Sequence, residues 1–288
     1  MSDTAEKKAA RQRERSRIKW GNTWKQIVLV LFAVACIFPV YYMFATSFKT
    51  DAEYLVNRFS IPLKPVLENF IEVLKGESFP RWFLNSIILT GGSIAFNTII
   101  ASLAAFAFAK MSFRNRDTIF SFILTLMVVP PVVMVIPLFK LMIQLHILNT
   151  YASVILIYVG LTLPFSIYML TNFFKTIPDE IMSSARIDGC PDIVILRKII
   201  LPLAAPAIIT IILVNALWVW NELLIAVIFL QRDELKTLMV GLTVFKSRYN
   251  LDIPATMSGL VLATIPMLVL YFIGQKYFIK GMVSGSLK

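Results

Sequence analysis

The sequence predicts an all-α polytopic membrane protein with six transmembrane helices. Of its 288 residues 58% are hydrophobic and only 16% are charged, and the mean hydropathy is +0.75. A soluble domain has about 45–50% apolar residues. Here the apolar excess lies in separate runs, each long enough to cross a hydrocarbon core of about 30 Å. The six runs cover residues 25–47, 82–109, 118–141, 151–174, 204–230 and 256–279.

The first run follows a basic N-terminal segment, residues 1–24, and together they resemble a signal peptide. Ala33-Val34-Ala35 even imitates a cleavage site. Cleavage there would cut the run near its middle, because apolar residues continue to Phe44. We therefore predict an uncleaved first span and a six-span domain over residues 25–280.

The distribution of Lys and Arg predicts the orientation of these spans. Residues 1–26 contain eight such residues, the 110–117 turn three, the 175–203 loop four and the C-terminal end three. The loops on the other side contain ten of the 28. Since basic residues favour the cytoplasmic side, both termini and the 175–203 loop are expected in the cytoplasm.

Proline and glycine interrupt several runs. Pro130, Pro131 and Pro137 lie in the third, Gly91-Gly92 in the second and Pro266 in the sixth. Proline removes a backbone donor and kinks a helix, and in a bilayer the freed carbonyls must find partners in neighbouring helices or a wet cavity. Kinks are therefore expected, either for packing alone or beside a transport pathway.

The 175–203 loop has the pattern of two short helices. Thr176 is a candidate N-cap, and the following acidic pair suits the positive end of a helix. Gly189 can take the left-handed conformation that ends a helix, and Pro191 suits an early position in the next one. The first helix is expected to expose four apolar side chains near one face: Ile181, Met182, Ala185 and Ile187. An amphipathic pair on lipid headgroups and a docking element for a cytoplasmic partner both fit this pattern.

Polar residues at membrane depth mark candidate pathway positions. Glu222 is the one acidic residue placed inside a predicted span, where a charged side chain costs about 2.5–3.5 kcal/mol at the bilayer centre. With helical spacing, Asn215, Trp218 and Glu222 are expected nearest a pathway, with Asn221 and Asn97 as further candidates. The alternatives are a carboxylate that reaches the interface and a tryptophan that anchors at lipid level.

Other chemistry is not favoured by the composition. Two cysteines, Cys36 and Cys190, fall at different predicted depths, and a lone His146 cannot make a His-rich metal site. There is no Gly-x-x-x-x-Gly-Lys-Ser/Thr phosphate-binding sequence. The net charge of +11 belongs to span-flanking residues, so no nucleic-acid partner is expected.

The 175–203 loop resembles the EAA loop of ABC importer permeases. Ser183-Ser184-Ala185 stands in the place of Glu-Ala-Ala, followed by Asp188-Gly189 and, at the family spacing, Leu201-Pro202. Ser183 and Ser184 depart from the pattern and are poor candidates for any role of the family's Glu. Further patches resemble the maltose-type, carbohydrate-uptake branch: Arg81–Ser86, Met127–Pro131, Ile136–Phe139, Leu148–Tyr151, Trp220–Glu222 and Ile279–Gly281.

This resemblance implies a MetI-like permease core and a non-catalytic inner-membrane subunit of a bacterial, binding-protein-dependent ABC importer for a sugar or oligosaccharide. No cofactor is expected in this chain, because ATP and Mg would be bound by two partner ATP-binding cassette subunits. The other implied partners are a homologous second permease, an extracytoplasmic solute-binding protein and the lipid bilayer. A stand-alone secondary transporter or channel is the alternative. The implied ATPase-coupling residues are Asp179, Glu180, Ala185, Asp188, Gly189 and Pro202.

Overall fold

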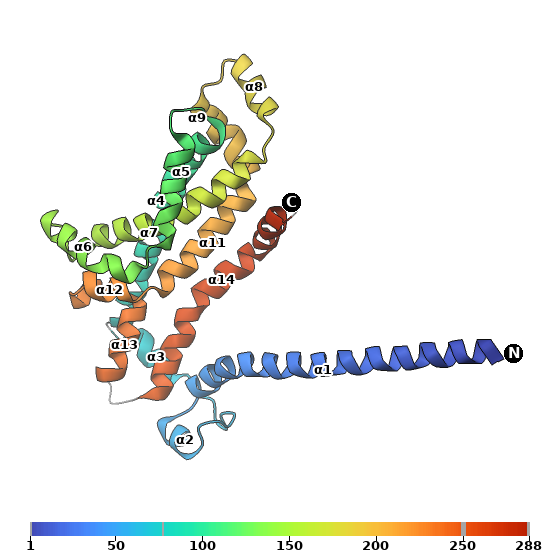
Figure 1. The fold of residues 1–288 in the computed structure, drawn as a ribbon. Helices are drawn as coiled ribbons and strands as arrows, with labels where there is room; N and C mark the ends of the chain where they lie inside the picture. The colour runs from blue at the N-terminus through green and yellow to red at the C-terminus, as the bar shows by residue number, and fades with distance from the viewer. Residues whose placement is uncertain (1, 77, 249–251, 287–288) are drawn as a thin grey trace. The chain divides into compact units, whose positions relative to one another are not determined.

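A computed structural model of the protein describes residues 2–76, 78–248 and 252–286, and every regular element in these ranges is a helix, as predicted (Figure 1). The chain divides into two compact units: unit 1 is Met1–Phe70 with Asp252–Val261, and unit 2 is Ile71–Leu251 with Leu262–Lys288. In chain order the helices are α1 (Ser2–Ser47), α2 (Asp51–Val56), α3 (Glu68–Lys75), α4 (Ser78–Lys110), α5 (Arg116–Thr125), the 3₁₀-helix η1 (Leu126–Val128), α6 (Pro131–Gln144), α7 (Tyr151–Lys175), α8 (Asp179–Ile187), α9 (Asp192–Ile195), the π-helix η2 (Leu196–Ile200), α10 (Leu201–Leu203), α11 (Ala205–Asn221), α12 (Leu224–Phe229), the 3₁₀-helix η3 (Asp233–Leu235), α13 (Leu238–Arg248) and α14 (Ile253–Ser286).

In unit 1, the C-terminal part of α1 is an apolar helix without a buried stripe. Its Thr23–Ser47 segment is long and apolar enough to cross a membrane, and none of the side chains in its most apolar window is buried. A helix that is apolar all round requires lipid or other membrane helices as its surroundings. At its end, Ser258 Oγ donates to the Ser47 carbonyl at 3.0 Å, which ties the start of α14 to α1.

In unit 2, α4, α7 and α11 pack around one core. Ala101 and Ala105 of α4, Leu170 and Phe174 of α7 and Ala207 of α11 are each 1% exposed or less. Small side chains let membrane helices approach closely, so that dispersion contacts can stabilise the bundle. These three helices form the frame that positions the candidate sites below.

Gly92 and Pro266 lie inside uninterrupted helices. A Cβ at Gly92 would lie 2.9 Å from Ile155 Cδ1 of α7, so this glycine allows close packing of α4 on α7. Pro266 lies within α14, which continues on both sides of it. The expected perturbation at Gly91-Gly92 and Pro266 therefore does not break either helix.

The third apolar run, 118–141, is sharply bent. Arg116–Val128 and Pro131–Gln144 meet at 103°. Pro130 is the N-cap of α6 and Pro131 its first residue, and neither can donate a backbone hydrogen bond to continue the preceding helix. The expected kink is confirmed, and it is a right-angle break rather than a bent single helix.

The fifth run, 204–230, is not one helix, because α11 and α12 divide it. Asp192–Leu203 and Ala205–Asn221 meet at 78°, and α11 ends at Asn221, so that Glu222 lies outside it with φ −71° and ψ 128°. The prediction that Glu222 lies within a helix is therefore wrong. Among the described residues four helices are long and apolar enough to span a membrane, and six spans result if each bent pair counts as one.

Candidate functional sites

The loop of residues 175–203 contains the first candidate site. Its α8 ends in a Schellman motif: Gly189 N donates to Arg186 O and Cys190 N to Ala185 O, both at 3.0 Å. Gly189 has φ +78°, as the sequence predicts, and this left-handed conformation is what the motif requires. The prediction for Thr176 is wrong, because it is the C-cap of α7 and its Oγ1 donates to Phe173 O at 2.7 Å.

Of the four apolar side chains of α8 that are predicted to be exposed, two are buried and two are not. Met182 and Ala185 are 2% and 8% exposed and join an apolar cluster with Ile195 and other residues of unit 2. Ile187 is 86% exposed and Ile181 38%. The inner side chains anchor the helix on its own chain, so only the outer ones are available to a partner.

An ion pair holds the N-terminal end of α8. Lys110, at the end of α4, is 3% exposed in its side chain and lies 2.6 Å from Asp179 Oδ1; it also donates to Ile177 O at 2.6 Å. The hydrogen bond from Lys110 and its positive charge lower the pKa of the Asp179 carboxyl. The C-terminal end of α4 is thus tied to the start of α8. No local pattern marks Lys110, because its partner is 69 residues away.

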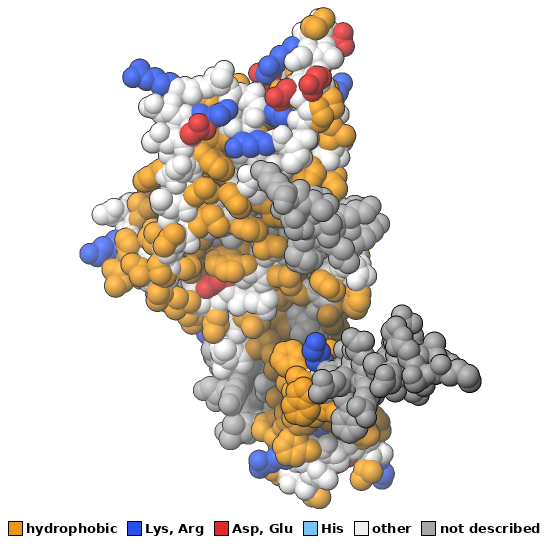
Figure 2. Space-filling model, turned by 45° about the vertical axis from the view of Figure 1, so that its right-hand side comes forward, with side chains coloured by type: hydrophobic (Ala, Val, Ile, Leu, Met, Phe, Trp, Pro, Cys, Tyr) orange, Lys and Arg blue, Asp and Glu red, His pale blue; other side chains and the backbone are white. Residues whose placement is uncertain are grey.

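The remaining predicted loop residues have local roles. Glu180 is exposed in the first turn of α8, and Asp188 is the C-cap, whose backbone N–H donates to Ser184 O at 3.1 Å. Pro202 lies in α10, next to the 78° bend. On the face seen in Figure 2, charged side chains of unit 2 gather mainly at the end that carries α8, next to a broad apolar surface.

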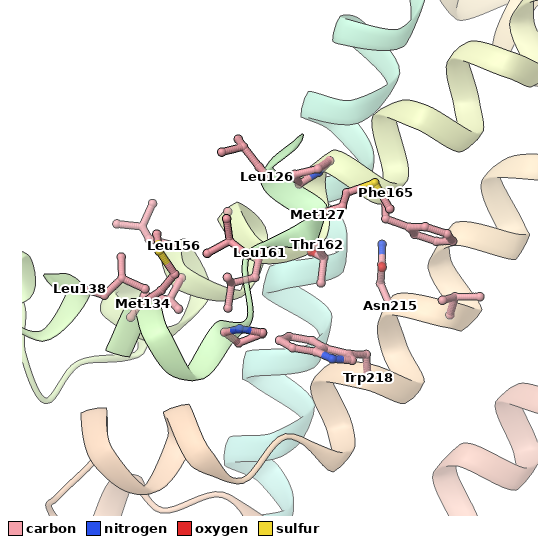
Figure 3. Close-up of a pocket in the computed structure, with 16 residues that line it drawn as sticks. Leu126, Met127, Met134, Leu138, Leu156, Leu161, Thr162, Phe165, Asn215 and Trp218 are labelled. Atoms are coloured by element: carbon pink, nitrogen blue, oxygen red, sulfur yellow. The ribbon is translucent and has the colours of Figure 1, made fainter. Parts of the chain in front are cut away.

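A cavity of about 410 Å³ is the second candidate site. It is lined by η1, α6, α7 and α11. At the bend between η1 and α6, Val129 of the connection and Pro131, the first residue of α6, also lie in its wall. The right-angle bend therefore helps to form the cavity. Figure 3 shows Asn215 and Trp218 of α11 beside Thr162 of α7 in this wall.

Asn97 and Asn215 belong to one buried hydrogen-bond chain. Asn97 Nδ2 donates to Thr162 Oγ1 at 2.8 Å. Asn215 Nδ2 donates to Asn97 Oδ1 at 3.2 Å and to Ser166 Oγ at 2.8 Å. Asn215 lines the cavity, whereas Asn97 is behind it and 1% exposed. Thr162 and Ser166 were not predicted, since small hydroxyl residues are common in membrane helices.

The other three candidates separate in space. Trp218 lines the cavity, and its ring meets that of Tyr158 edge-on at 5.8 Å between centroids. Asn221 is exposed and donates to Leu217 O at 2.7 Å. Neither Asn221 nor Glu222 lines the cavity.

The Glu222 carboxylate caps the next helix. It accepts hydrogen bonds from the backbone N–H groups of Ile225, at 3.0 Å, and Ala226, at 3.2 Å, and from the hydroxyl of Tyr158 at 2.9 Å. These bonds give the carboxylate partners within the protein, and Glu222 does not line the cavity. No pattern in the sequence marked Tyr158.

Comparison with known proteins identifies the family. The model of the binding-protein-dependent transport system inner membrane component matches residues 97–284. A protein of Caldicellulosiruptor sp. strain Rt8B.4 named as an ABC transporter permease is 38% identical over 95% of this chain and 99% of its own length. The trehalose/maltose transport system permease of Thermococcus litoralis is 34% identical, over 92% and 97%.

A solved structure agrees in fold. The crystal structure of a bacterial ABC transporter involved in import of the acidic polysaccharide alginate contains a chain that superimposes with a TM-score of 0.80 at 26% identity, covering 90% of this chain and 97% of that one. The family match excludes the alternative of a stand-alone secondary transporter or channel. The chain belongs to the binding-protein-dependent transport system inner membrane component family and is a non-catalytic permease subunit of an ABC importer.

Proposed function

We propose that this permease forms half of a translocation pathway for a sugar or oligosaccharide and couples it, through α8, to ATP hydrolysis by separate subunits. The observation that carries the proposal is the cavity, where an apolar wall and the Trp218 ring stand beside the polar groups of Thr162 and Asn215. Sugars combine apolar ring faces with hydroxyl groups, and stacking aromatics with a few fixed polar groups suit them. The named substrates of the Thermococcus litoralis relative, trehalose and maltose, support this class.

The partners we propose follow from the family resemblance and from the absence of a phosphate-binding sequence in this chain. Two ATP-binding cassette subunits bind ATP and Mg, a homologous second permease completes the pathway, and an extracytoplasmic protein captures the solute. The chain lies in the bacterial inner membrane with both termini cytoplasmic, supported by the excess of Lys and Arg on that side. This orientation places the 175–203 loop where the ATP-hydrolysing subunits are.

The coupling surface we propose centres on Ile187. This side chain is 86% exposed on a helix that is anchored by the buried Met182 and, at its N-terminal end, by the Lys110–Asp179 pair. A partner that contacts the exposed Ile187 can displace α8, and the Lys110–Asp179 pair would pass that displacement to α4. Asp179 is therefore an anchoring residue, and Ile187 is the contact residue.

The test measures binding of the ATP-hydrolysing subunit to the permease pair in lipid nanodiscs. Ile187→Ala removes about three buried carbons at the interface, or about 2 kcal/mol, which is a roughly 30-fold weaker affinity. Ile61→Ala is the matched control, because Ile61 is 71% exposed in the connection between α2 and α3. Unchanged affinity for Ile187→Ala would remove α8 from the interface, and failure of the complete importer to take up any sugar would refute the sugar pathway.

A further inference from the structure

The cavity wall contains few polar groups and no charged residue among the described lining residues. Thr162 and Asn215 are its polar side chains, apart from the indole of Trp218. Asn215 is 3% exposed, so its orientation is set by protein contacts rather than by solvent. The direction of each hydrogen bond that Asn215 and its neighbours make therefore decides whether the cavity presents a donor or an acceptor to a solute.

The backbone of α7 fixes the two hydroxyl groups. Thr162 Oγ1 donates its proton to Tyr158 O at 2.7 Å, and Ser166 Oγ donates to Thr162 O at 3.2 Å. A hydroxyl has one proton and two lone pairs. Both hydroxyls have thus used their proton on a carbonyl, and toward any other neighbour they can only accept.

The fixed hydroxyls in turn orient both amides. Thr162 Oγ1 must accept, so the group facing it is Asn97 Nδ2, at 2.8 Å. That places Asn97 Oδ1 toward Asn215, whose Nδ2 donates to it and to Ser166 Oγ. Both hydrogens of the Asn215 amide are then used. No described residue donates to Asn215 Oδ1, so the unpaired polar atom of this cavity-lining residue is a carbonyl acceptor.

We propose that Asn97 and Ser166 hold Asn215 as a fixed acceptor, so that this half of the pathway selects a neutral, hydroxyl-bearing solute and disfavours an anionic one. The inference rests on the proposed sugar pathway and narrows its substrate class. A sugar hydroxyl donates to Asn215 Oδ1 while an apolar ring face meets Trp218. A carboxylate has no proton to donate at neutral pH, and the described wall offers it no cation. Asn215 is the specificity-determining residue, and Asn97 is a positioning residue.

The experiment measures trisaccharide binding to the assembled permease–ATPase complex in nanodiscs without its binding protein, by calorimetry. The probes are a panel of neutral trisaccharides and the acidic trigalacturonate. Neutral trisaccharides are expected to bind and trigalacturonate to bind at least tenfold more weakly. Asn215→Leu should weaken neutral binding about fivefold, the value of one hydrogen bond. Asn97→Leu, which frees the Asn215 amide to turn, should reduce the preference for the neutral probe with no loss of complex assembly.

Asn221→Leu is the matched control, on the same helix but outside the cavity, and should leave all affinities unchanged. Equal or tighter binding of trigalacturonate to the unmodified complex overturns the inference, and this measurement needs no variant to fold. Unchanged affinity in Asn215→Leu overturns it as well. In both cases ATP-driven uptake by the complete importer, measured separately, decides whether the sugar pathway itself stands.

Discussion

Gly189 allows the proposed coupling role of the 175–203 loop to be tested by a change in backbone conformation alone. Its φ is +78°, and a Cβ added there would meet nothing within 4 Å. Substitution by Ala therefore creates no clash in the permease, and its cost is the left-handed backbone itself, about 1–2 kcal/mol for an L-residue. This cost would weaken the Schellman hydrogen bonds donated by Gly189 N and Cys190 N, so the end of α8 would fray.

The assay is affinity of the ATP-hydrolysing subunit for nanodisc-embedded permease, together with solute-stimulated ATP hydrolysis. If docking requires the native turn, Gly189→Ala lowers the affinity by at most about 5–30-fold, the equivalent of 1–2 kcal/mol. Gly189→Asn should lower it less, because Asn tolerates the left-handed region. Gly189→Trp tests whether there is room for a large side chain in the complex. If it lowers the affinity more than Gly189→Ala does, the partner occupies the open space beside the turn.

Two results would refute this reasoning. Full affinity in Gly189→Ala would show that docking does not depend on the left-handed turn. A loss in Gly189→Asn equal to that in Gly189→Ala would show that the backbone conformation is not the quantity that matters.

Two stability predictions concern the anchoring contacts. Met182→Ala should destabilise α8 by about 2–5 kcal/mol, as expected for truncating a buried Met. Faster amide hydrogen exchange confined to α8 would show this. Ile181→Ala should have a much smaller effect, because Ile181 is partly exposed. Tyr158→Phe removes a hydrogen bond to the Glu222 carboxylate and should cost about 1.5–3 kcal/mol, seen as a lower thermal unfolding temperature. Tyr168→Phe, on the exposed side of the same helix, is the control, and equal shifts in both variants would contradict the role assigned to Tyr158.

Local features with a direct physical cause were predictable from the sequence. Apolar runs long enough for a bilayer predicted the four long apolar helices. Pro130-Pro131 marked the sharper of the two bent pairs, because proline cannot donate the bonds that continue a helix. Gly189 was predicted in its left-handed conformation for a similar reason. The break at Glu222 was not, since no glycine or proline stands there and the cause is a side-chain carboxylate that caps α12 from outside the helix.

Membrane embedding, the helical class and the left-handed turn at Gly189 were thus determined by the sequence itself, because each depends on neighbouring residues along the chain. Tertiary structure alone decided which polar groups meet. Asn97 and Asn215 are 118 positions apart, and only the packing of α4 and α11 against α7 brings their amides together. The direction of their hydrogen bonds is set by two carbonyls of α7, which no residue pattern records. For the same reason Met182 faces inward while Ile187 remains exposed: helical periodicity defines a face, and the neighbouring helices determine whether it is covered.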